Sequence, residues 1–253
     1  MSDLDPFKVF MEIQLGLPRN GPGSREATRA AFKLLPPLPS EPEILDLGAG
    51  QGAATLELLR LTDGRVTAVD IMKPFLDRLE ANAEGEGVPE TRLRTLCADF
   101  EDLHLPQGVF DLIWSEGAIY NLGFEEGLAL WRPFLAPGRY AVISDCIWKA
   151  DEPSLEIRHF WDEAYPSMGT LAENAARAQR AGFEVLGTHW LTEDDWWTEY
   201  YGPMKDRIRA LLPDYAGAPE ALAVFKEEEE EMELFERFQD QYGYCFFVLQ
   251  AKS

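Results

Sequence analysis

Short apolar runs alternate with segments of helical spacing through the middle of the chain. The runs have strand length and are mostly apolar, as expected for strands that are buried on both faces. They lie at 44–47, 65–69, 93–98, 109–114 and 139–145, and the helical segments between them lie at 53–61, 73–85 and 124–135. Strands and helices that alternate in this way predict an α/β fold with a parallel, doubly wound sheet.

The pattern changes towards both ends of the chain. Helical spacing is found at 7–17, 24–35, 154–165 and 171–181, whereas 183–191 and 242–251 have the character of strands. Between those two strands, residues 192–241 are mostly helical in pattern and far exceed an ordinary connection of about 4–6 residues. This length predicts a lid or substrate subdomain, inserted before a final strand that pairs antiparallel at the sheet edge.

Four regions follow from this pattern. They are an N-terminal helical cap at 1–42, a core at 43–191, a helical insertion at 192–241 and a final strand segment at 242–253 that completes the core. The one run of like charges, 227–231, lies in the insertion and keeps helical spacing around it. We interpret it as a solvated helix face, with an acidic docking surface as the alternative.

Composition narrows the classes of partner. The net charge of the 253-residue chain is -22, which repels phosphate backbones and anionic lipid surfaces, so we expect no nucleic-acid or membrane partner. The chain shows no basic leader and no apolar run of membrane-spanning length, which predicts a cytoplasmic protein. Three scattered histidines and three cysteines without ligand spacing predict reduced thiols and no metal site.

A glycine-rich turn follows the first central strand. Gly48, Gly50 and Gly52 alternate there, so the backbone can turn sharply with no side chain between it and a ligand. The turn leads into the helical segment at 53–61, whose first amides attract anionic groups. Such a site suits either a phosphate or the carboxylate of an amino-acid-like cofactor.

Acidic residues at the strand ends help to choose between these two ligands. Asp70 ends the second strand, where a carboxylate can accept from both hydroxyls of a ribose. Asp46 precedes the glycine turn and opposes a pyrophosphate by like-charge repulsion. Asp99 and Phe100 follow the third strand, where they can accept from an exocyclic amine and pack on a flat base. These residues favour an adenosyl amino acid over a nicotinamide dinucleotide, which stays the alternative.

A second dehydrogenase signal is weaker. Tyr201 and Lys205 have the Tyr-x-x-x-Lys spacing of short-chain dehydrogenases. We expect Gly202 and Pro203 to interrupt the helix between them and to prevent a shared face.

Together these residues resemble class I S-adenosylmethionine-dependent methyltransferases from about Ile44 onward. Four further stretches, at 21–24, 114–124, 197–201 and 240–244, are similar to a bacterial subgroup that acts on small molecules. The resemblance implies a Rossmann-like seven-stranded sheet, mostly parallel with the last strand antiparallel. It also implies methyl transfer from S-adenosyl-L-methionine to an unidentified small molecule, with S-adenosyl-L-homocysteine as the product.

The resemblance also implies roles for individual residues. Gly48, Gly50 and Gly52 would line the methionine moiety, Asp70 the ribose, Asp99 and Phe100 the adenine, and Ile71 and Met72 the other adenine face; Asp46 and Ser115 complete the cofactor set. In the part that handles the acceptor, Glu116 and Tyr120 are the catalytic candidates because they follow the fourth strand. The aromatic candidates for the substrate pocket are Trp148, Trp161, Tyr165, Trp197 and Tyr201.

Three questions stay open at this point. A non-catalytic cofactor-binding or sensing protein would use the same fold, and a nicotinamide-dependent oxidoreductase is the second alternative. The sequence selects neither the acceptor nor the attacking atom, and a general base is needed only if the acceptor must lose a proton. A homodimer is also left open.

Overall fold

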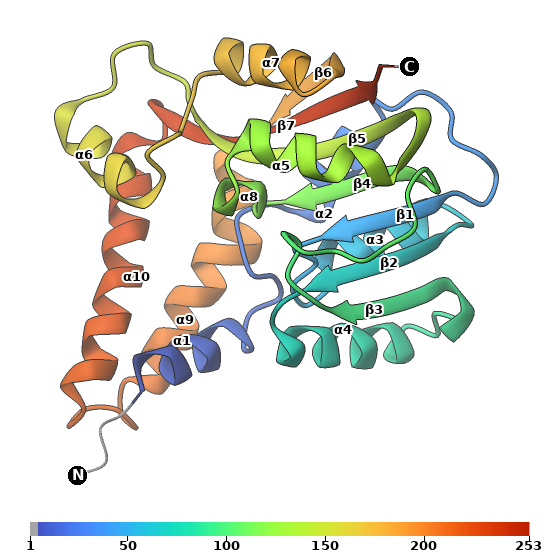
Figure 1. Cartoon of the computed structure of the whole chain (residues 1–253). Helices are drawn as coiled ribbons and strands as arrows, with labels where there is room; N and C mark the ends of the chain where they lie inside the picture. The colour runs from blue at the N-terminus through green and yellow to red at the C-terminus, as the bar shows by residue number, and fades with distance from the viewer. Residues whose placement is uncertain (1–4, 253) are drawn as a thin grey trace.

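The computed structural model describes residues 5–252, and its seven strands form one sheet (Figure 1). The strands are β1 (Glu43–Leu47), β2 (Arg65–Asp70), β3 (Leu93–Cys97), β4 (Phe110–Glu116), β5 (Leu135–Trp148), β6 (Phe183–Trp190) and β7 (Tyr242–Ala251). Their order is β3-β2-β1-β4-β5-β7-β6, and β7 pairs antiparallel with both of its neighbours. The predicted mostly parallel sheet with an antiparallel last strand is confirmed.

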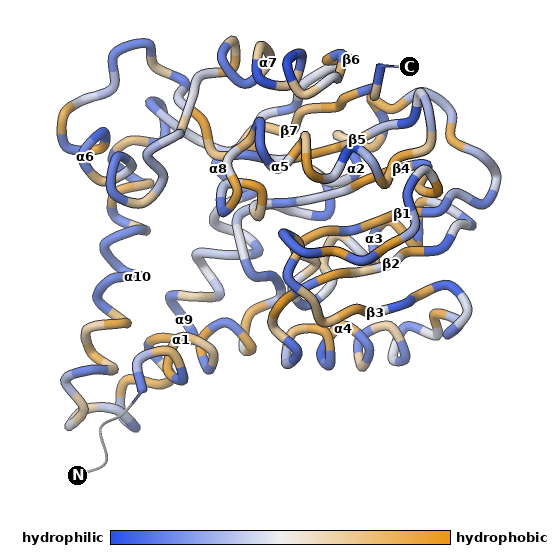
Figure 2. The backbone as a smooth tube through the Cα atoms, in the orientation of Figure 1, coloured by the Kyte–Doolittle hydropathy of each residue, from blue (hydrophilic) through white to orange (hydrophobic). Residues whose placement is uncertain are grey.

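The helices cover both faces of this sheet. They are α1 (Pro6–Gln14), α2 (Arg25–Phe32), α3 (Ala53–Leu61), α4 (Lys73–Gly85), α5 (Phe124–Trp131), α6 (Leu155–Ala164), α7 (Leu171–Arg180), α8 (Glu193–Trp196), α9 (Gly202–Leu211) and α10 (Pro219–Phe238). The apolar side chains of α3 and α4 pack in the core on one face, and those of α5 and α7 pack in the core on the other. Figure 2 shows the apolar strands between these two helical layers.

Alternation along the strands explains the two cores. In β1, Ile44 points into one core and Leu45 into the other, and in β2 Ala68 and Val69 divide in the same way. Successive side chains of a strand point to opposite faces, so a strand buried on both sides is apolar at consecutive positions. The doubly wound arrangement therefore follows directly from the short apolar runs.

The fifth strand is longer than its apolar run predicts. Helix α5 ends at Trp131 rather than at residue 135, because Pro133 lies in the 3-10 turn Arg132–Phe134 that follows it. Residues 136–138 form an irregularity inside β5, at the register shift opposite 110–112, and Gly138 has φ +70° there. Regular pairing with β4 resumes at Tyr140, so the strand expected at 139–145 is confirmed and extends further at both ends.

The insertion between β6 and β7 is helical, as predicted. Helix α8 continues through a π-helical turn, Trp197–Tyr201, directly into α9, so the expected interruption at Gly202 and Pro203 is wrong. Pro203 follows the π-helical turn directly and lies within this continuous helical run. Tyr201 and Lys205 still form no dehydrogenase pair, because the Tyr201 hydroxyl donates to Glu231 and Lys205 is exposed.

The N-terminal segment packs on the insertion rather than standing alone. Helix α1 lies against α9 and α10, and Val9 and Ile13 share a core with Met204 and Phe225 (Figure 1). The four predicted regions stay a prediction, and their outermost residues, 1–4 and 253, lie outside the described residues. Among residues 5–252, no helix is both long and apolar enough to cross a membrane.

Candidate functional site

A cavity of about 520 Å³ opens at the carboxyl ends of β1, β2 and β4. In the strand order the direction of winding reverses between β1 and β4, and open α/β sheets bind ligands at such a switch point. The residues of interest that line it are Phe10, Arg19, Asn20, Asp46, Gly48, Gly50, Gln51, Asp70, Ile71, Met72, Asp99, Phe100, Glu116 and Tyr120. Most of the cofactor residues expected from the sequence therefore meet in one place.

The glycine turn shapes the floor of this cavity. Gly48 has φ +74°, and a Cβ at this position would lie 2.4 Å from the Cβ of Ala118, which also lines the cavity. Gly52 differs, since it does not line the cavity and its Cβ would lie 2.1 Å from Leu79 of α4. The third glycine therefore allows close packing of α4, whereas the first leaves the floor open.

Asp70 connects the glycine turn to the next strand end. Its carboxylate accepts from the amide of Gly50 at 2.8 Å and from the amide of Met72 at 2.8 Å. Burial raises its pKa above the usual value, while the two amides act in the opposite direction. Asp70 is thus held at the cavity wall by backbone groups, and its position suits the expected contact with a ribose.

Asp46 lies beneath the turn and is 1% exposed. The hydroxyl of Thr55 donates to it at 2.5 Å. Burial raises the pKa of Asp46 to about 7, and the charges of Glu116 and Asp70 act in the same direction. A cationic group in the cavity would stabilise the charged form of Asp46, so the floor suits an ammonium better than a phosphate.

The far end of the cavity is apolar. Ile71 is 61% exposed there, although it is a large aliphatic residue, and Met72 lines the cavity beside it. Phe100 packs edge-on against Trp131 with ring centroids 5.6 Å apart. Asp99 accepts from the amide of Glu101 at 2.9 Å. This end therefore offers apolar surfaces and a nearby carboxylate to a flat ring.

Ser115 is the next-to-last residue of β4. It is fully buried and its hydroxyl donates to the carbonyl oxygen of Leu47 at 2.8 Å. The side chain does not line the cavity. The hydroxyl links β4 to β1, and the expected place of Ser115 in the cofactor set stays a prediction.

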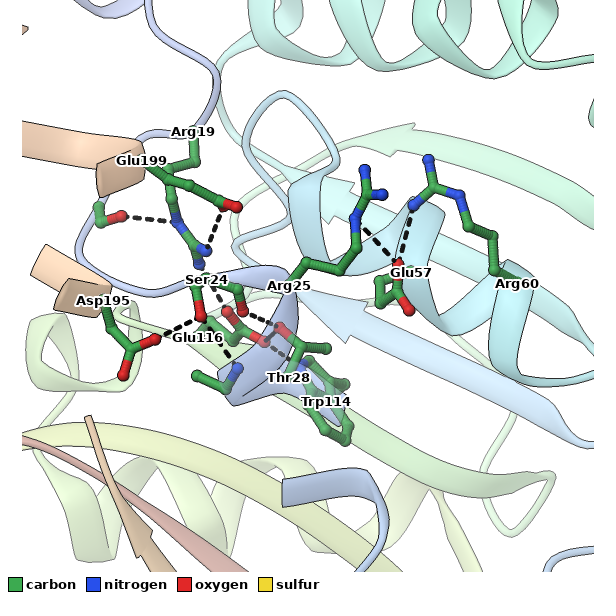
Figure 3. Close-up of polar contacts among 12 residues, drawn as sticks. Arg19, Ser24, Arg25, Thr28, Glu57, Arg60, Trp114, Glu116, Asp195 and Glu199 are labelled. Atoms are coloured by element: carbon green, nitrogen blue, oxygen red, sulfur yellow. Dashed lines mark hydrogen bonds and ion pairs between the residues drawn. The ribbon is translucent and has the colours of Figure 1, made fainter. Parts of the chain in front are cut away.

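Glu116 is fully engaged by neighbouring side chains (Figure 3). One oxygen accepts from Arg19 at 2.7 Å, and the other accepts from Thr28 at 2.8 Å and from the Trp114 indole at 2.9 Å. Arg19 also donates to the carbonyl of Gly21 at 2.8 Å. These contacts support a structural role for Glu116, because both oxygens are already used to hold the N-terminal segment against β4.

Tyr120 lies in the 3-10 turn Ile119–Asn121 and lines the cavity. Desolvation raises the pKa of its hydroxyl above 10, so the group stays a neutral phenol at physiological pH. A neutral phenol can donate one hydrogen bond and accept others. Tyr120 is therefore the polar side chain best placed to meet an acceptor.

The expected aromatic pocket does not line this cavity. None of Trp148, Trp161, Tyr165, Trp197 and Tyr201 is part of its wall. Tyr165 has its ring 6.0 Å from that of Tyr120 and donates to the buried Asp145 at 3.1 Å. The five residues instead pack beyond Tyr120, between the sheet, α6 and the insertion.

Sequence reasoning did not identify the N-terminal side of the cavity. Asn20 accepts from the amide of Gln51 at 3.0 Å, and the Gln51 side chain donates to the carbonyl of Gln14 at 2.8 Å. Arg19 and Phe10 also line the cavity. The Gly-Pro-Gly sequence at 21–23 indicates a loop, but it does not show where that loop lies.

Comparisons with known proteins agree with this geometry. Residues 44–138 match the family model described as a methyltransferase domain. A dimethylglycine N-methyltransferase of Parasynechococcus marenigrum is 32% identical over 152 residues, which are 57% of this chain and 54% of the relative. A SAM-dependent methyltransferase of Geobacter sulfurreducens, solved with S-adenosyl-L-homocysteine, has a TM-score of 0.83 at 20% identity and covers 100% of both chains. A similar protein from Thiobacillus denitrificans, solved with the same ligand, also has a TM-score of 0.83, at 21% identity and with 99% and 100% covered.

These similarities leave the acceptor open. The chain spans about half the length of the curated relatives it matches, with 54%, 46% and 58% covered in three of them. The names of these relatives describe methyl transfer to nitrogen, to carbon and to oxygen. The comparisons thus identify the domain and the fold and do not select a substrate.

Proposed function

We propose that this chain, which carries a methyltransferase domain at residues 44–138, transfers a methyl group from S-adenosyl-L-methionine to a small molecule. The observation that carries the proposal is the order of chemistry along one cavity. Buried Asp46 lies under the glycine turn, Asp70 follows at the β2 end, and Ile71 and Phe100 lie beyond it. A ligand that matches this order has an amino-acid end, a ribose and a flat base.

The residues present fit that cofactor. Asp70 would accept from the ribose hydroxyls, since each carboxylate oxygen keeps a free acceptor site beside its backbone amide. Ile71, Met72 and Phe100 would pack on the adenine, which accounts for the exposure of Ile71. When bound, S-adenosyl-L-methionine supplies a methyl carbon that is already attached to a good leaving group.

The contribution of the chain is alignment and exclusion of water. The N-terminal segment contacts the glycine turn through Asn20 and Gln51, and Tyr120 lines the same cavity. Tyr120 would orient the acceptor through its neutral hydroxyl. Glu116 would hold the N-terminal segment against β4 through Arg19 and Thr28 rather than take a proton.

The nicotinamide alternative fits this cavity less well. A pyrophosphate on the glycine turn would lie over Asp46 and near Glu116, where like charges oppose it. Isothermal titration calorimetry with S-adenosyl-L-methionine, S-adenosyl-L-homocysteine and NADH tests the choice. We expect binding of both sulfur ligands and no binding of NADH. NADH binding without either sulfur ligand would overturn the proposal.

A second experiment separates an enzyme from a sensor. The protein is incubated with methyl-labelled S-adenosyl-L-methionine and the small-molecule fraction of a bacterial extract. We expect label in a small molecule with the wild-type chain and at least tenfold less with Asp70→Ala. Cofactor binding without transfer of label to any small molecule would support the sensing alternative.

A further inference from the structure

A second cavity, of about 410 Å³, lies between α1, α6 and α10. Its walls include the aromatic rings of Phe7, Phe10 and Phe160, the carboxylates of Glu228 and Glu231, and at the exposed rim the carboxylate of Glu227. Phe10 also lines the cavity at the glycine turn, so the two cavities meet at this side chain. A molecule in the second cavity therefore lies next to the cofactor site.

The carboxylates in this cavity lack basic partners. Glu231 accepts from the hydroxyl of Tyr201 at 2.7 Å. Within residues 5–252, neither Glu228 nor Glu231 has a lysine, arginine or histidine within 4.0 Å, although Lys226 pairs with Glu230 nearby. Desolvation raises the pKa of both groups, that of Glu228 to about 7, and the charge of Glu231 adds to the shift of Glu228. Both side chains are partly buried, and a partly desolvated negative charge without a cation is unfavourable, so a cationic ligand would stabilise this pair.

This finding corrects the interpretation of the acidic run. Glu229 and Glu230 are exposed and form a solvated face, as predicted. Glu228 and Glu231 are one turn apart and face the cavity, so for them that prediction is wrong.

An independent feature is found among the aromatic residues beside the cavity. Phe160 packs against Trp161 at 5.1 Å, and Trp161 packs against Tyr242 at 5.2 Å, both edge to face. The hydroxyl of Tyr242, a fully buried residue, and the indole nitrogen of Trp161 are buried without any hydrogen-bond partner among the described residues. The charge of Glu231 raises the pKa of both Tyr242 and Tyr120, so these hydroxyls lie within its electrostatic reach. Buried polar groups are normally satisfied, so these two atoms mark an incompletely satisfied polar site in the layer directly behind Phe160, which itself lines the cavity.

We propose that this second cavity binds the methyl acceptor by a protonated amine, with Glu228 and Glu231 as the counter-charges and the surrounding aromatic rings packed around the cation. This inference rests on the proposed function. Aromatic faces attract organic cations, and carboxylates attract ammonium groups. An anionic acceptor would be repelled, and a neutral one would leave both carboxylates uncompensated. The rest of the acceptor extends past Phe10 towards Tyr120 and the cofactor cavity.

Three matched probes test the charge preference. The full chain, saturated with S-adenosyl-L-homocysteine, is titrated by calorimetry with phenethylamine, 2-phenylethanol and phenylacetate. We expect the amine to bind at least tenfold more tightly than the alcohol, and phenylacetate to bind most weakly. Glu231→Gln should remove most of the preference for the amine and leave the affinity for the alcohol unchanged. In this variant the Tyr201 hydroxyl can still donate to the new amide oxygen.

Two further variants keep the test decisive. Glu228→Gln removes a carboxylate that accepts no side-chain hydrogen bond from the described residues, and it should also lower the amine affinity. Glu229→Gln, on the exposed face of the same helix, should change nothing. The absence of an amine preference, including the absence of binding by all three probes, would overturn this inference. If the wild-type chain does not bind S-adenosyl-L-homocysteine, the proposed function is overturned instead.

Discussion

The two cavities that meet at Phe10 are built in different ways. The cofactor cavity uses the ends of neighbouring strands and a turn whose three glycines lie within five consecutive residues. The second cavity uses side chains from α1, α6 and α10. More than a hundred residues separate α1 from α6 in the sequence. The first is largely a backbone structure, and the second is made by side chains of packed helices.

This difference explains how each cavity can recognise a ligand. Backbone amides and close glycine contacts admit one shape, and Asp70 is held in place by two of those amides. Side chains on helices can change without disturbing the sheet, so a family with one cofactor can have many acceptors. The largest effect is therefore expected where side chains hold the N-terminal segment against β4, and smaller effects where backbone groups shape the cofactor cavity.

The largest effect is expected from Arg19→Ala, which removes the ion pair between the N-terminal segment and Glu116 at the end of β4. Arg19 and Glu116 have side chains only 6% and 8% exposed, so the substitution leaves a buried carboxylate without its cation. We expect the free energy of unfolding in urea to fall by about 3–5 kcal/mol. The double variant Arg19→Met with Glu116→Gln should recover part of this loss. A loss below about 1 kcal/mol for the single variant would show that the ion pair does not stabilise the packing of the N-terminal segment on β4.

The next effect concerns the floor of the cofactor cavity. In Gly48→Ala the new methyl group meets Ala118 at 2.4 Å in a left-handed backbone conformation. We expect the Kd for S-adenosyl-L-homocysteine to rise roughly 100-fold, about 2.7 kcal/mol, in calorimetry. Gly85→Ala is the matched control, because a Cβ there meets nothing within 4 Å. Equal affinities of the two variants would mean that the ligand does not use the turn.

A smaller effect is expected at the cavity wall. Asp70→Ala removes the expected contact with the ribose and leaves two backbone amides without their acceptor. We expect at least tenfold weaker binding of S-adenosyl-L-homocysteine, from a lost interaction of roughly 1.5–3 kcal/mol. Asp77→Ala, an exposed change on α4, is the control. Unchanged affinity in Asp70→Ala would place the ribose elsewhere.

The smallest effect is a pH dependence of cofactor binding. The pKa of Asp46 is raised to about 7 by burial, so the free protein gains a proton here as the pH falls through 7. The ammonium of S-adenosyl-L-homocysteine favours the charged carboxylate, so its affinity should fall from pH 8 to pH 6, by up to about tenfold per pH unit below the pKa. Asp46→Asn should flatten that profile. A steep profile retained in Asp46→Asn would assign the proton to another group.

The same shift has a consequence for the stability of the free protein. The folded-state pKa of Asp46 lies above its unfolded value of 3.8, so folded chains bind more protons than unfolded chains between the two values. The contribution of Asp46 to stability is therefore fully present below about pH 4 and is lost as the pH rises through about 7. Urea titrations of wild type and Asp46→Asn across this range would measure it, and identical slopes for both proteins would contradict it.

The amino-acid sequence by itself determined the sheet and the cofactor cavity. Apolar runs locate the seven strands to within a few residues, most clearly the central strands, which are buried on both faces, whereas the edge strands β3 and β6 are partly exposed. Asp46, Gly48, Gly50 and Asp70 could be identified because short-range chain geometry brings strand ends to one edge. The error at Gly202 arose where helix continuation overrode a local turn signal.

Only the tertiary structure decided the other side of the site. Arg19 reaches Glu116 across 97 residues, and Glu231 faces a cavity whose opposite wall, α1, lies more than two hundred residues earlier in the chain. Helical spacing shows which side chains share a face, but it does not show what covers that face. For this reason the acidic run could be placed on a helix from the sequence, whereas the exposure of Glu229 and the enclosure of Glu231 follow from packing alone.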